Sequence, residues 1–446
     1  MISTRNPATG AELHRYESHD DAAVDAALAA TAAAAQRWAV TGLDERLALL
    51  RAVGKLLSDR RDEYAALITA EMGKPLAESL AEIDKCAWNC RVVADLAPGW
   101  LADREIASGA TRSWISYEPL GVIFAVMPWN FPFWQVLRFA CAALSAGNAA
   151  LLKHSPDVTG CALAIEALFT DAGAPPGLFR SLVVEAERVP QVSARIVADP
   201  RIAAVTLTGS ERAGSAIAQA AGAALKKTVL ELGGSDPFVV LGDADVQTAA
   251  AAAARSRFGN AGQSCVSAKR FIVVDAVADE FVALLLTEIR SLEIGPLARA
   301  DLRDAAVRQI EQSVTAGARL LTGGTTVGGP GFFLEPAVLD QVTPGMAVFA
   351  EETFGPVAAV IRARDDEHAV ELANDTDFGL GCSVWGIPEH ALAVGRRIRS
   401  GALFVNAPVA SDPRLPFGGV GRSGYGRELS AEGVREFTNL RTVVLA

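Results

Sequence analysis

The sequence predicts an α/β protein made of two successive units, each with a mainly parallel β-sheet that helices cover on both faces. From Leu120 onward, short runs that are apolar throughout alternate with helical segments, which is the pattern of strands buried on both sides. The preceding residues, 20–100, carry apolar side chains every three or four positions, which predicts helices. A second alternation of strands and helices begins near Gly233.

The N-terminal region is expected to contain four helices. Their apolar spacing gives the ranges 22–38, 44–57, 62–72 and 77–97. Asp44 and Asp62 stand where N-cap residues belong, because a carboxylate accepts hydrogen bonds from the first free N–H groups of a helix. Residues 113–117 alternate in polarity and predict an edge strand or one arm of a hairpin.

The two α/β units follow. In the first, we expect strands at 121–127, 149–153, 180–184, 203–208 and 228–232, with helices at 133–146, 158–172, 189–198 and 212–222. In the second, we expect strands at 237–241, 271–274, 358–362 and 402–406, with helices at 277–289, 301–317, 366–374 and 388–400. The tail at 442–445 reads as a short strand that could pair with the 113–117 arm, within the chain or across subunits.

The composition limits the classes of function. The chain has 446 residues, enough for two or three domains, and its net charge of −11 argues against a surface for nucleic acid or anionic membranes. The first residues show no apolar signal core, and no apolar run approaches the roughly 20 residues of a membrane helix. The six cysteines and five histidines are scattered, so we expect reduced thiols in the cytoplasm and no metal site.

One cysteine lies in a segment that suits a nucleophile. Cys265 follows Gly259, Gly262 and Gln263 in a polar stretch between a helical segment and a strand. Glycines let the backbone bend, and the nearby cations Lys269 and Arg270 would favour a thiolate. The alternative is a small buried hydrophobic residue, which is the commoner fate of an intracellular cysteine.

Three further segments end predicted strands with polar groups. Asn130, between two aromatic residues and two prolines, offers an amide N–H to an oxyanion; a packed turn is the alternative. Gly209 and Ser210 open a helix, where N–H groups attract phosphate, or Ser210 is an ordinary N-cap. Glu231, beside two glycines, could be a general base or a salt-bridged surface residue.

Taken together and in order, these segments resemble those of the aldehyde dehydrogenases, over nearly the whole chain. The carriers of the resemblance are Pro-Trp-Asn-Phe-Pro (128–132), Lys153, Thr-Gly-Ser (208–210), Glu-Leu-Gly-Gly (231–234), Gly-Gln-Ser-Cys (262–265), Glu-Glu-Thr-Phe-Gly-Pro (351–356), Pro-Phe-Gly-Gly (416–419) and Ser-Gly-Tyr-Gly-Arg-Glu (423–428). The resemblance implies a Rossmann-like cofactor domain, a second α/β catalytic domain and a β arm for assembly into a homodimer or homotetramer. It assigns 1–100 and 120–232 to the cofactor domain, 233–422 to the catalytic domain, and 101–119 and 423–446 to the arm.

The resemblance also implies residue roles. Cys265 would be the nucleophile, Asn130 with the Cys265 backbone N–H the oxyanion hole, Glu231 the base that activates the deacylating water, and Glu428 a more remote proton-relay carboxylate. The implied reaction oxidises an aldehyde to its acid through a thioester, with NAD or NADP as cofactor. The implied cofactor contacts are Trp129, Lys153, Ser155, Gly209, Ser210, Leu232, Glu352 and Phe354.

The substrate preference is expected to depend on positive charge. Arg138, eight residues past Asn130, resembles the carboxylate-binding arginine of succinate-semialdehyde dehydrogenases; the alternative is a structural ion pair. Those enzymes often carry a second arginine where this chain has Gly259, so Arg414, just after Ser411, is a candidate substitute.

Three positions depart from the family pattern. Phe139 replaces a lysine of the proton relay, and Pro156 replaces the glutamate of NAD-preferring relatives, so NADP should be tolerated. The loop at 292–296 is shorter than usual, and it could weaken cofactor binding.

Three other functions remain open from the sequence. A dehydrogenase of broader aldehyde specificity and an acylating enzyme that passes the thioester to coenzyme A would both keep Cys265. Glu231 favours hydrolysis over transfer to coenzyme A. A non-catalytic binding or structural relative would have no reason to retain Cys265, Asn130 and Glu231 together.

Overall fold

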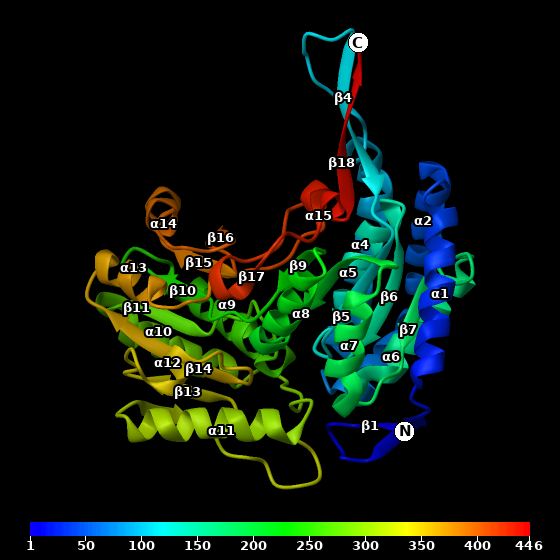
Figure 1. Cartoon of the computed structure of the whole chain (residues 1–446). Coiled ribbons are helices and arrows are strands. Elements are labelled where there is room, and N and C mark those ends of the chain that lie inside the picture. Colours follow the sequence, from blue (N-terminus) through cyan, green and yellow to red (C-terminus); the bar gives the residue numbers. More distant parts are fainter.

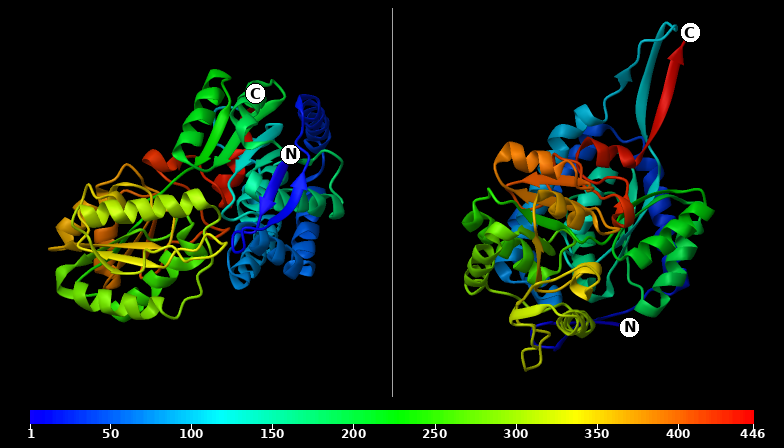
Figure 2. Two further views of the ribbon diagram at one scale, coloured as in Figure 1. Left: turned by 90° about the horizontal axis from the view of Figure 1, so that it is seen from below. Right: turned by 90° about the vertical axis from the view of Figure 1, so that its left-hand side faces the viewer.

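The computed structural model describes all residues, 1–446, and shows two α/β lobes and a projecting β arm (Figure 1). The chain begins with the antiparallel hairpin β1 (Ile2–Arg5) and β2 (Glu12–Tyr16). The arm and the N-terminus lie at opposite ends of the molecule (Figure 2). None of the helices has the length and apolar character needed to cross a membrane.

The N-terminal region is helical, as predicted. It consists of α1 (Asp21–Trp38), α2 (Leu43–Asp59), α3 (Arg61–Met72) and α4 (Leu76–Trp100). The prediction that Asp44 and Asp62 are N-caps is wrong, because α2 starts after Gly42 and α3 after Arg60. Both aspartates lie instead in the first turn, where their charge is still favourable beside the positive end of the helix dipole.

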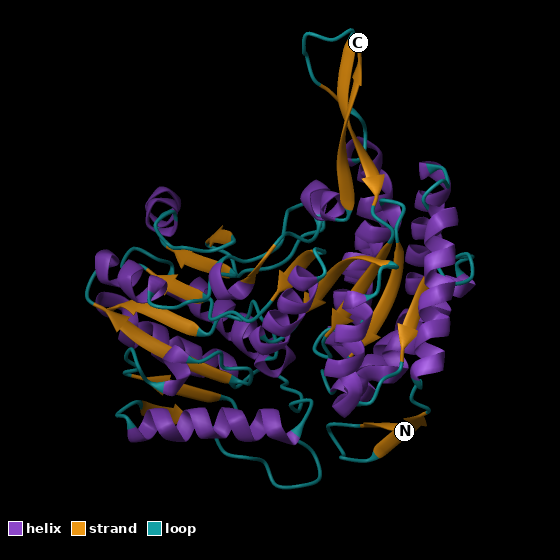
Figure 3. Ribbon diagram, viewed as in Figure 1, coloured by secondary structure: helices purple, strands orange, loops and turns teal.

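The first lobe contains a six-stranded sheet with the order β17-β9-β8-β5-β6-β7, parallel except for β17. Its strands are β5 (Val122–Met127), β6 (Ala149–His154), β7 (Phe179–Leu182), β8 (Ile202–Thr208), β9 (Lys227–Glu231) and β17 (Gly424–Tyr425). The helices between them are α5 (Trp134–Ser145), α6 (Thr159–Asp171), α7 (Val189–Ala198) and α8 (Glu211–Ala223), with short 3₁₀ turns η1 (Pro156–Val158) and η2 (Ala186–Arg188). Together with α1–α4 they cover the sheet with helices on both faces (Figure 3).

The second lobe contains a seven-stranded sheet with the order β12-β13-β14-β11-β10-β15-β16. Its strands are β10 (Pro237–Val240), β11 (Arg270–Val274), β12 (Arg319–Thr322), β13 (Ala337–Asp340), β14 (Val357–Ala363), β15 (Gly381–Trp385) and β16 (Ala402–Val405). Its helices are α9 (Val246–Phe258), α10 (Asp275–Ile289), α11 (Ala300–Thr315), α12 (Ala347–Ala350), α13 (Asp366–Asn374) and α14 (Pro388–Gly395). The sequence did not predict β12, β13 and β15, which are short and, in β15, open with small residues.

The arm is a three-stranded sheet in which β4 (Arg112–Pro119) pairs with β3 (Arg104–Glu105) and β18 (Thr438–Leu445). The C-terminal strand therefore pairs with the predicted 113–117 strand within one chain. Residues 423–437 do not extend into the arm, because β17 joins the first sheet and α15 (Ser430–Glu436) contacts α4 and α5. A last 3₁₀ turn, η4 (Gly421–Ser423), leads into β17.

Candidate active site

Two cavities meet at Cys265. The substrate cavity, as we name it, has a volume of about 420 Å³ and lies among α4, α5, the Cys265 loop and residues 408–411. The cofactor cavity has a volume of about 370 Å³ and lies between the ends of β5, β8 and β9 and the loop that contains Glu352. Cys265 and Gln135 line both cavities, so one sulfur atom can be reached from two sides.

The Cys265 loop owes its path to a tight turn, η3 (Gly259–Gly262). Asn260 and Ala261 adopt positive φ angles of 53° and 51°, and Gly262 follows at 74°. A Cβ atom at Gly262 would lie 2.1 Å from the carbonyl oxygen of Gly355, so only glycine fits there. The buried guanidinium of Arg257 donates to the carbonyl oxygens of Gly262 and Gly355 and fixes these two segments together.

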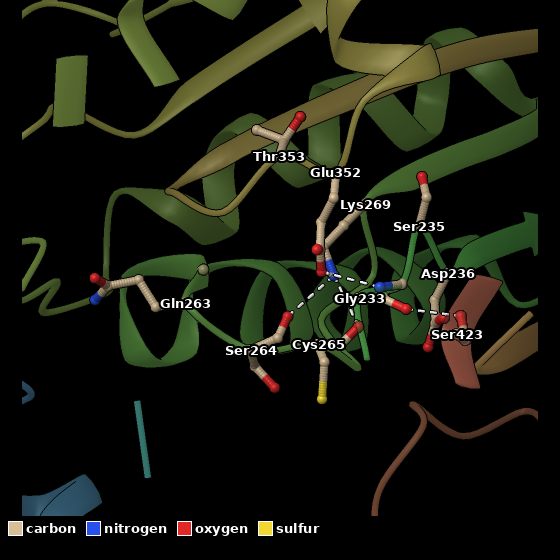
Figure 4. A network of polar contacts seen from close by, with 12 residues as sticks. Gly233, Ser235, Asp236, Gln263, Ser264, Cys265, Lys269, Glu352, Thr353 and Ser423 are labelled. Atoms are coloured by element: carbon tan, nitrogen blue, oxygen red, sulfur yellow. Dashed lines mark hydrogen bonds and ion pairs between the residues drawn. The ribbon is translucent and has the colours of Figure 1, made fainter. Parts of the chain in front are cut away.

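Of the two cations expected to favour the Cys265 thiolate, Lys269 does lower the pKa of the thiol, whereas Arg270 is engaged elsewhere. Lys269 Nζ donates to the carbonyl oxygens of Ser264 (3.0 Å) and Cys265 (2.8 Å), and the sulfur points away from this ammonium group (Figure 4). The guanidinium of Arg270 instead binds the carbonyl oxygens of Ser235, Leu372 and Ala373. Burial raises the pKa of Cys265 to about 12, and the positive charges of Lys269 and Arg138 offset only part of that rise.

Asn130 is held rigidly beside the cysteine loop. Its Nδ2 donates to the backbone carbonyl oxygen of Gln263 at 3.0 Å, and its backbone carbonyl oxygen accepts from Asn260 Nδ2 at 2.9 Å. These bonds use one of the two Nδ2 hydrogens and leave the other without a protein acceptor. Asn130 and Cys265 both line the cofactor cavity.

The start of α5, just beyond Asn130, rests on a buried carboxylate that sequence reasoning missed. Glu82 Oε1 accepts from the backbone N–H groups of Phe133 (2.8 Å) and Trp134 (2.9 Å). Its Oε2 accepts from Lys74 Nζ at 2.6 Å, and both side chains are almost fully buried. This ion pair therefore fixes the helix that carries Arg138.

Glu231 and Glu428 are buried neighbours. Antiparallel pairing of β17 with β9 sets Gly424 opposite Glu231 and brings the Glu428 segment to this strand. Burial raises the pKa of both carboxyls, and the charge of Glu428 raises that of Glu231 further. Neither oxygen of Glu231 has a hydrogen-bond partner, and Glu231 does not line either cavity, although its charge affects the Cys265 thiol.

Arg138 belongs to this buried carboxyl cluster. Its Nε forms an ion pair with Glu428, and its Nη2 donates to Thr208 Oγ1 at 3.2 Å. The structural ion pair considered for Arg138 is therefore present, yet the side chain also lines the substrate cavity. The positive charge of Arg138 lowers the pKa of Glu231 and Glu428, against the effect of burial.

Six of the eight residues expected to contact the cofactor line the cofactor cavity. They are Trp129, Gly209, Ser210, Leu232, Glu352 and Phe354. Ser210 caps α8, because its Oγ accepts from the backbone N–H of Ala213 at 3.3 Å. Glu352 is fixed by the N–H of Gly234 at 3.0 Å and by Lys269 at 3.5 Å.

Lys153 and Ser155 do not line this cavity; Lys153 lies near the end of β6, and Ser155 directly follows the strand. Lys153 is buried, and burial lowers its pKa to about 8. Ser155 Oγ donates to Asp157 Oδ2, which also accepts from Arg299 Nη1, both at 2.9 Å. Arg299, which sequence reasoning missed, lines the cofactor cavity and lies 5.6 Å from the ring centre of Trp129.

The substrate cavity contains one of the two further substrate residues expected from the sequence. Ser411 lines it, whereas Arg414 does not. Arg414 is exposed and binds Asp412 through Nε and Nη2, and it packs over Trp88. Two other cations line the cavity, Lys85 on α4 and Arg255 on α9.

Neither cation is marked by a sequence motif of its own, and only the position of Lys85 relative to Glu82 connects it to the site. Lys85 lies three residues beyond Glu82, so the two share a face of α4. Arg255 lies in the last turn of α9, just before the turn that leads to Cys265.

The residues of the cofactor cavity suit a nicotinamide dinucleotide. The first turn of α8 presents N–H groups behind Ser210, as a phosphate site requires, and Trp129 and Phe354 offer flat apolar faces. A Cβ at Gly214 would lie 2.4 Å from Leu232 Cδ2, so α8 packs directly against the cavity wall. No group of three or more His, Cys, Asp or Glu side chains is arranged to hold a metal ion.

The chain is similar over nearly its whole length to known proteins of one family. The model of the aldehyde dehydrogenase family matches residues 1–443. The chain is 46% identical to the probable succinate-semialdehyde dehydrogenase [NADP(+)] of Synechocystis over 100% of both chains. It is 47% identical to the succinate semialdehyde dehydrogenase [NAD(P)+] Sad of Escherichia coli, over 98% of this chain and 96% of that protein. The structure of succinic semialdehyde dehydrogenase from Streptococcus pyogenes in complex with NADP+ superposes with a TM-score of 0.96 at 36% identity over 100% of both chains. This chain belongs to the aldehyde dehydrogenase family.

Proposed function

We propose that the protein oxidises succinate semialdehyde to succinate, with NAD or NADP as cofactor, through a thioester on Cys265. The observation that carries this proposal is that Cys265 lies where the two cavities meet. The substrate cavity is lined by the cations Lys85, Arg138 and Arg255, which suits an aldehyde with a distal carboxylate. The relatives named for this reaction support the choice of substrate.

The side chains around Cys265 divide the chemistry between them. The thiol must lose its proton before the sulfur adds to the aldehyde carbon. The aldehyde oxygen then gains negative charge, which the free N–H of Asn130 stabilises together with the backbone N–H of Cys265. A nicotinamide dinucleotide in the cofactor cavity supplies the acceptor for the hydride that leaves this carbon, and the carbon remains bound to sulfur as a thioester.

Glu231 completes the cycle in this proposal. As a base it removes a proton from water, the resulting hydroxide adds to the thioester carbon, and the C–S bond breaks to release the acid. A buried carboxyl with a raised pKa suits this role, because its ionised form is a stronger base than an exposed carboxylate. Glu428, beside Glu231 and paired with Arg138, is the next carboxylate to which the proton can pass.

The cofactor is held, we propose, by the six residues that line the cofactor cavity, with Lys153 and Ser155 on the adenosine side. Because residue 156 is a proline, no acidic side chain at this position would repel the 2′-phosphate of NADP. The charge of the nearby Asp157 is compensated by Arg299. Both features support the use of NADP as well as NAD.

The substrate is held by the walls of the substrate cavity. Ser411 is proposed as a direct contact. Arg138 adds positive potential, but it shares its charge with Glu428. Arg414 stays outside this proposal because its guanidinium is engaged by Asp412 at the surface.

Assembly and compartment complete the proposal. We propose a homodimer or homotetramer formed through the arm, whose β18 exposes the apolar side chains Leu440, Val444 and Leu445. All six cysteines are free thiols, which fits a reducing cytoplasm.

The experiment that tests the proposed function compares kcat/KM for succinate semialdehyde, glutarate semialdehyde and a neutral aliphatic aldehyde, each with NAD and NADP. We expect succinate semialdehyde to be preferred. Replacing Cys265 with Ala should lower the rate of succinate-semialdehyde oxidation by more than about 10³-fold, because no other group can form the thioester. Cofactor binding, followed by fluorescence of the reduced dinucleotide, should persist in that variant. Equal rates for charged and neutral aldehydes would contradict the proposed substrate.

A further inference from the structure

The charges that line the substrate cavity are unequally compensated. Five ionisable side chains line it besides Cys265: Glu78, Glu82, Lys85, Arg138 and Arg255. The two acids are engaged, since Glu82 binds Lys74 and the start of α5, and Glu78 accepts from the backbone N–H of Asn260 at 2.8 Å. Arg138 is paired with Glu428. Lys85 and Arg255 are left without a carboxylate partner.

Lys85 is the more enclosed of these two cations. It is half-buried on α4, whereas Arg255 is exposed on α9. The Nζ of Lys85 donates to Ser411 Oγ at 2.7 Å and lies 4.5 Å from the ring centre of Trp134. An ammonium group has three N–H donors, and the single bond to Ser411 leaves two of them for a ligand.

Burial lowers the pKa of Lys85 to about 8, although the charges of Asp412 and Glu82 act in the opposite direction. Both acids form their ion pairs with other cations, so an anion in the cavity would stabilise the charged form of Lys85. Ser411 is itself a hydroxyl that can turn its hydrogen toward an anion while its oxygen still accepts from Lys85. The Trp134 ring covers one side of the ammonium and shields it from water. Lys85, Ser411 and Trp134 all line the substrate cavity.

We infer that Lys85 Nζ and Ser411 Oγ together bind the distal carboxylate of the aldehyde substrate. This inference rests on the proposed function and names the group that selects a charged aldehyde. It assigns the main anchor to α4, an element of the first lobe. Arg138, which the sequence favoured, is paired instead with Glu428, the carboxylate beside the proposed base Glu231.

The test compares two substrates that differ in charge, succinate semialdehyde and its methyl ester. In the Lys85→Met variant, which keeps a chain of similar length, kcat/KM for succinate semialdehyde should fall roughly 10- to 100-fold, the loss expected for a charge-assisted hydrogen bond. The value for the methyl ester should stay within about twofold, because the ester carries no charge for Lys85 to bind. Lys85→Arg should restore most of the loss. Ser411→Ala should cause a smaller loss of about two- to fivefold, again only for the acid.

Inhibition by succinate provides a readout that does not depend on turnover of the charged substrate. With the methyl ester as substrate, the inhibition constant for succinate should rise in Lys85→Met by a similar factor. Lys55→Met is the matched control, because Lys55 is exposed on α2 and pairs with Asp59, and it should leave both measurements unchanged.

The outcomes separate the inference from the proposed function. If kcat/KM in Lys85→Met falls equally for acid and ester, or for neither, the proposed role of Lys85 is wrong. A preference of the wild-type enzyme for the acid would still support the proposed substrate. A wild-type enzyme without preference for the acid would remove the proposed substrate and this inference with it.

Discussion

The two cavities that meet at Cys265 differ in how their charged side chains are satisfied. In the cofactor cavity, Glu352 is bound by Lys269 and the backbone of Gly234, and Arg299 by Asp157 and Asp301. In the substrate cavity, two cations, Lys85 and Arg255, have no acidic partner. The charged side chains of the cofactor cavity are thus paired before a ligand binds, whereas the substrate cavity retains unpaired positive charge for its ligand.

This difference indicates two modes of recognition. A rigid cavity with satisfied polar groups selects by shape, because its side chains do not need to rearrange on binding. A cavity with uncompensated charge selects by charge, because a neutral ligand leaves the cations without a partner. Glu231 and Glu428 line neither cavity, and Arg138, which does line the substrate cavity, has its charge compensated by Glu428.

The largest effect is expected at Glu231, which should matter for every aldehyde alike. Glu231→Gln should lower steady-state kcat by roughly 10²- to 10³-fold, since the base for deacylation is lost. A burst of reduced cofactor, about one per active site, should remain in rapid-mixing experiments. Full steady-state turnover to the acid would show that Glu231 is not the base.

The pH dependence of deacylation should report the same group. Only the ionised form of Glu231 accepts a proton, and its raised pKa means that the ionised fraction is small in acid and grows as pH rises. In the wild type, kcat should therefore increase with pH through this pKa. Glu231→Gln should remove that limb of the profile.

A smaller effect, still common to both kinds of substrate, is expected at Arg138. Removing its charge in Arg138→Leu should raise the pKa of Glu231 and Glu428 and lower kcat at pH 7 by roughly 10- to 100-fold for acid and methyl ester alike. The rising limb of the pH profile should move to higher pH. Arg138→Lys, which keeps the charge, is the matched control. A loss confined to succinate semialdehyde would make Arg138 the carboxylate anchor instead.

The smallest effect is expected at Arg255, and it should be specific to charge. Because this side chain is exposed, Arg255→Met should raise KM for succinate semialdehyde only about two- to fivefold and leave the methyl ester unchanged. Salt screens exposed charges, so the difference between wild type and variant should shrink at 1 M NaCl. A change in kcat for the ester would place Arg255 outside this charge-selective role.

Much of the fold could be predicted because its signals are local. Apolar runs and helical spacing located α7 and α13 to the residue and most other elements of the two sheets within a few positions. The failures also have local causes. β15 begins Gly-Cys-Ser, and the four-residue β13 is too short to show a period, so their strand character depends on neighbours in the sheet.

The site could be predicted as a set of residues but not as a set of contacts. Resemblance named Cys265, Asn130 and Glu231, and the structure brings the first two to one cavity and the third to the adjoining buried cluster. It could not show that Lys269 would bind the carbonyl oxygen of Cys265, or that Arg138 would pair with Glu428. Lys85 carries no signal of its own until Ser411, more than three hundred residues later, is placed against it.

The sequence alone indicated most of the helices and strands and the side chains that can perform chemistry, because periodicity and residue type are properties of the chain itself. The tertiary structure decided which charges are compensated. An ion pair depends on the distance between side chains and on the water removed around them, and both are set only when α4, α5, β9 and the segments that carry Ser411 and Glu428 come together. For this reason the charge of Arg138, the carboxylate anchor expected from the sequence, is compensated by Glu428. Lys85 is the anchor that we propose in its place.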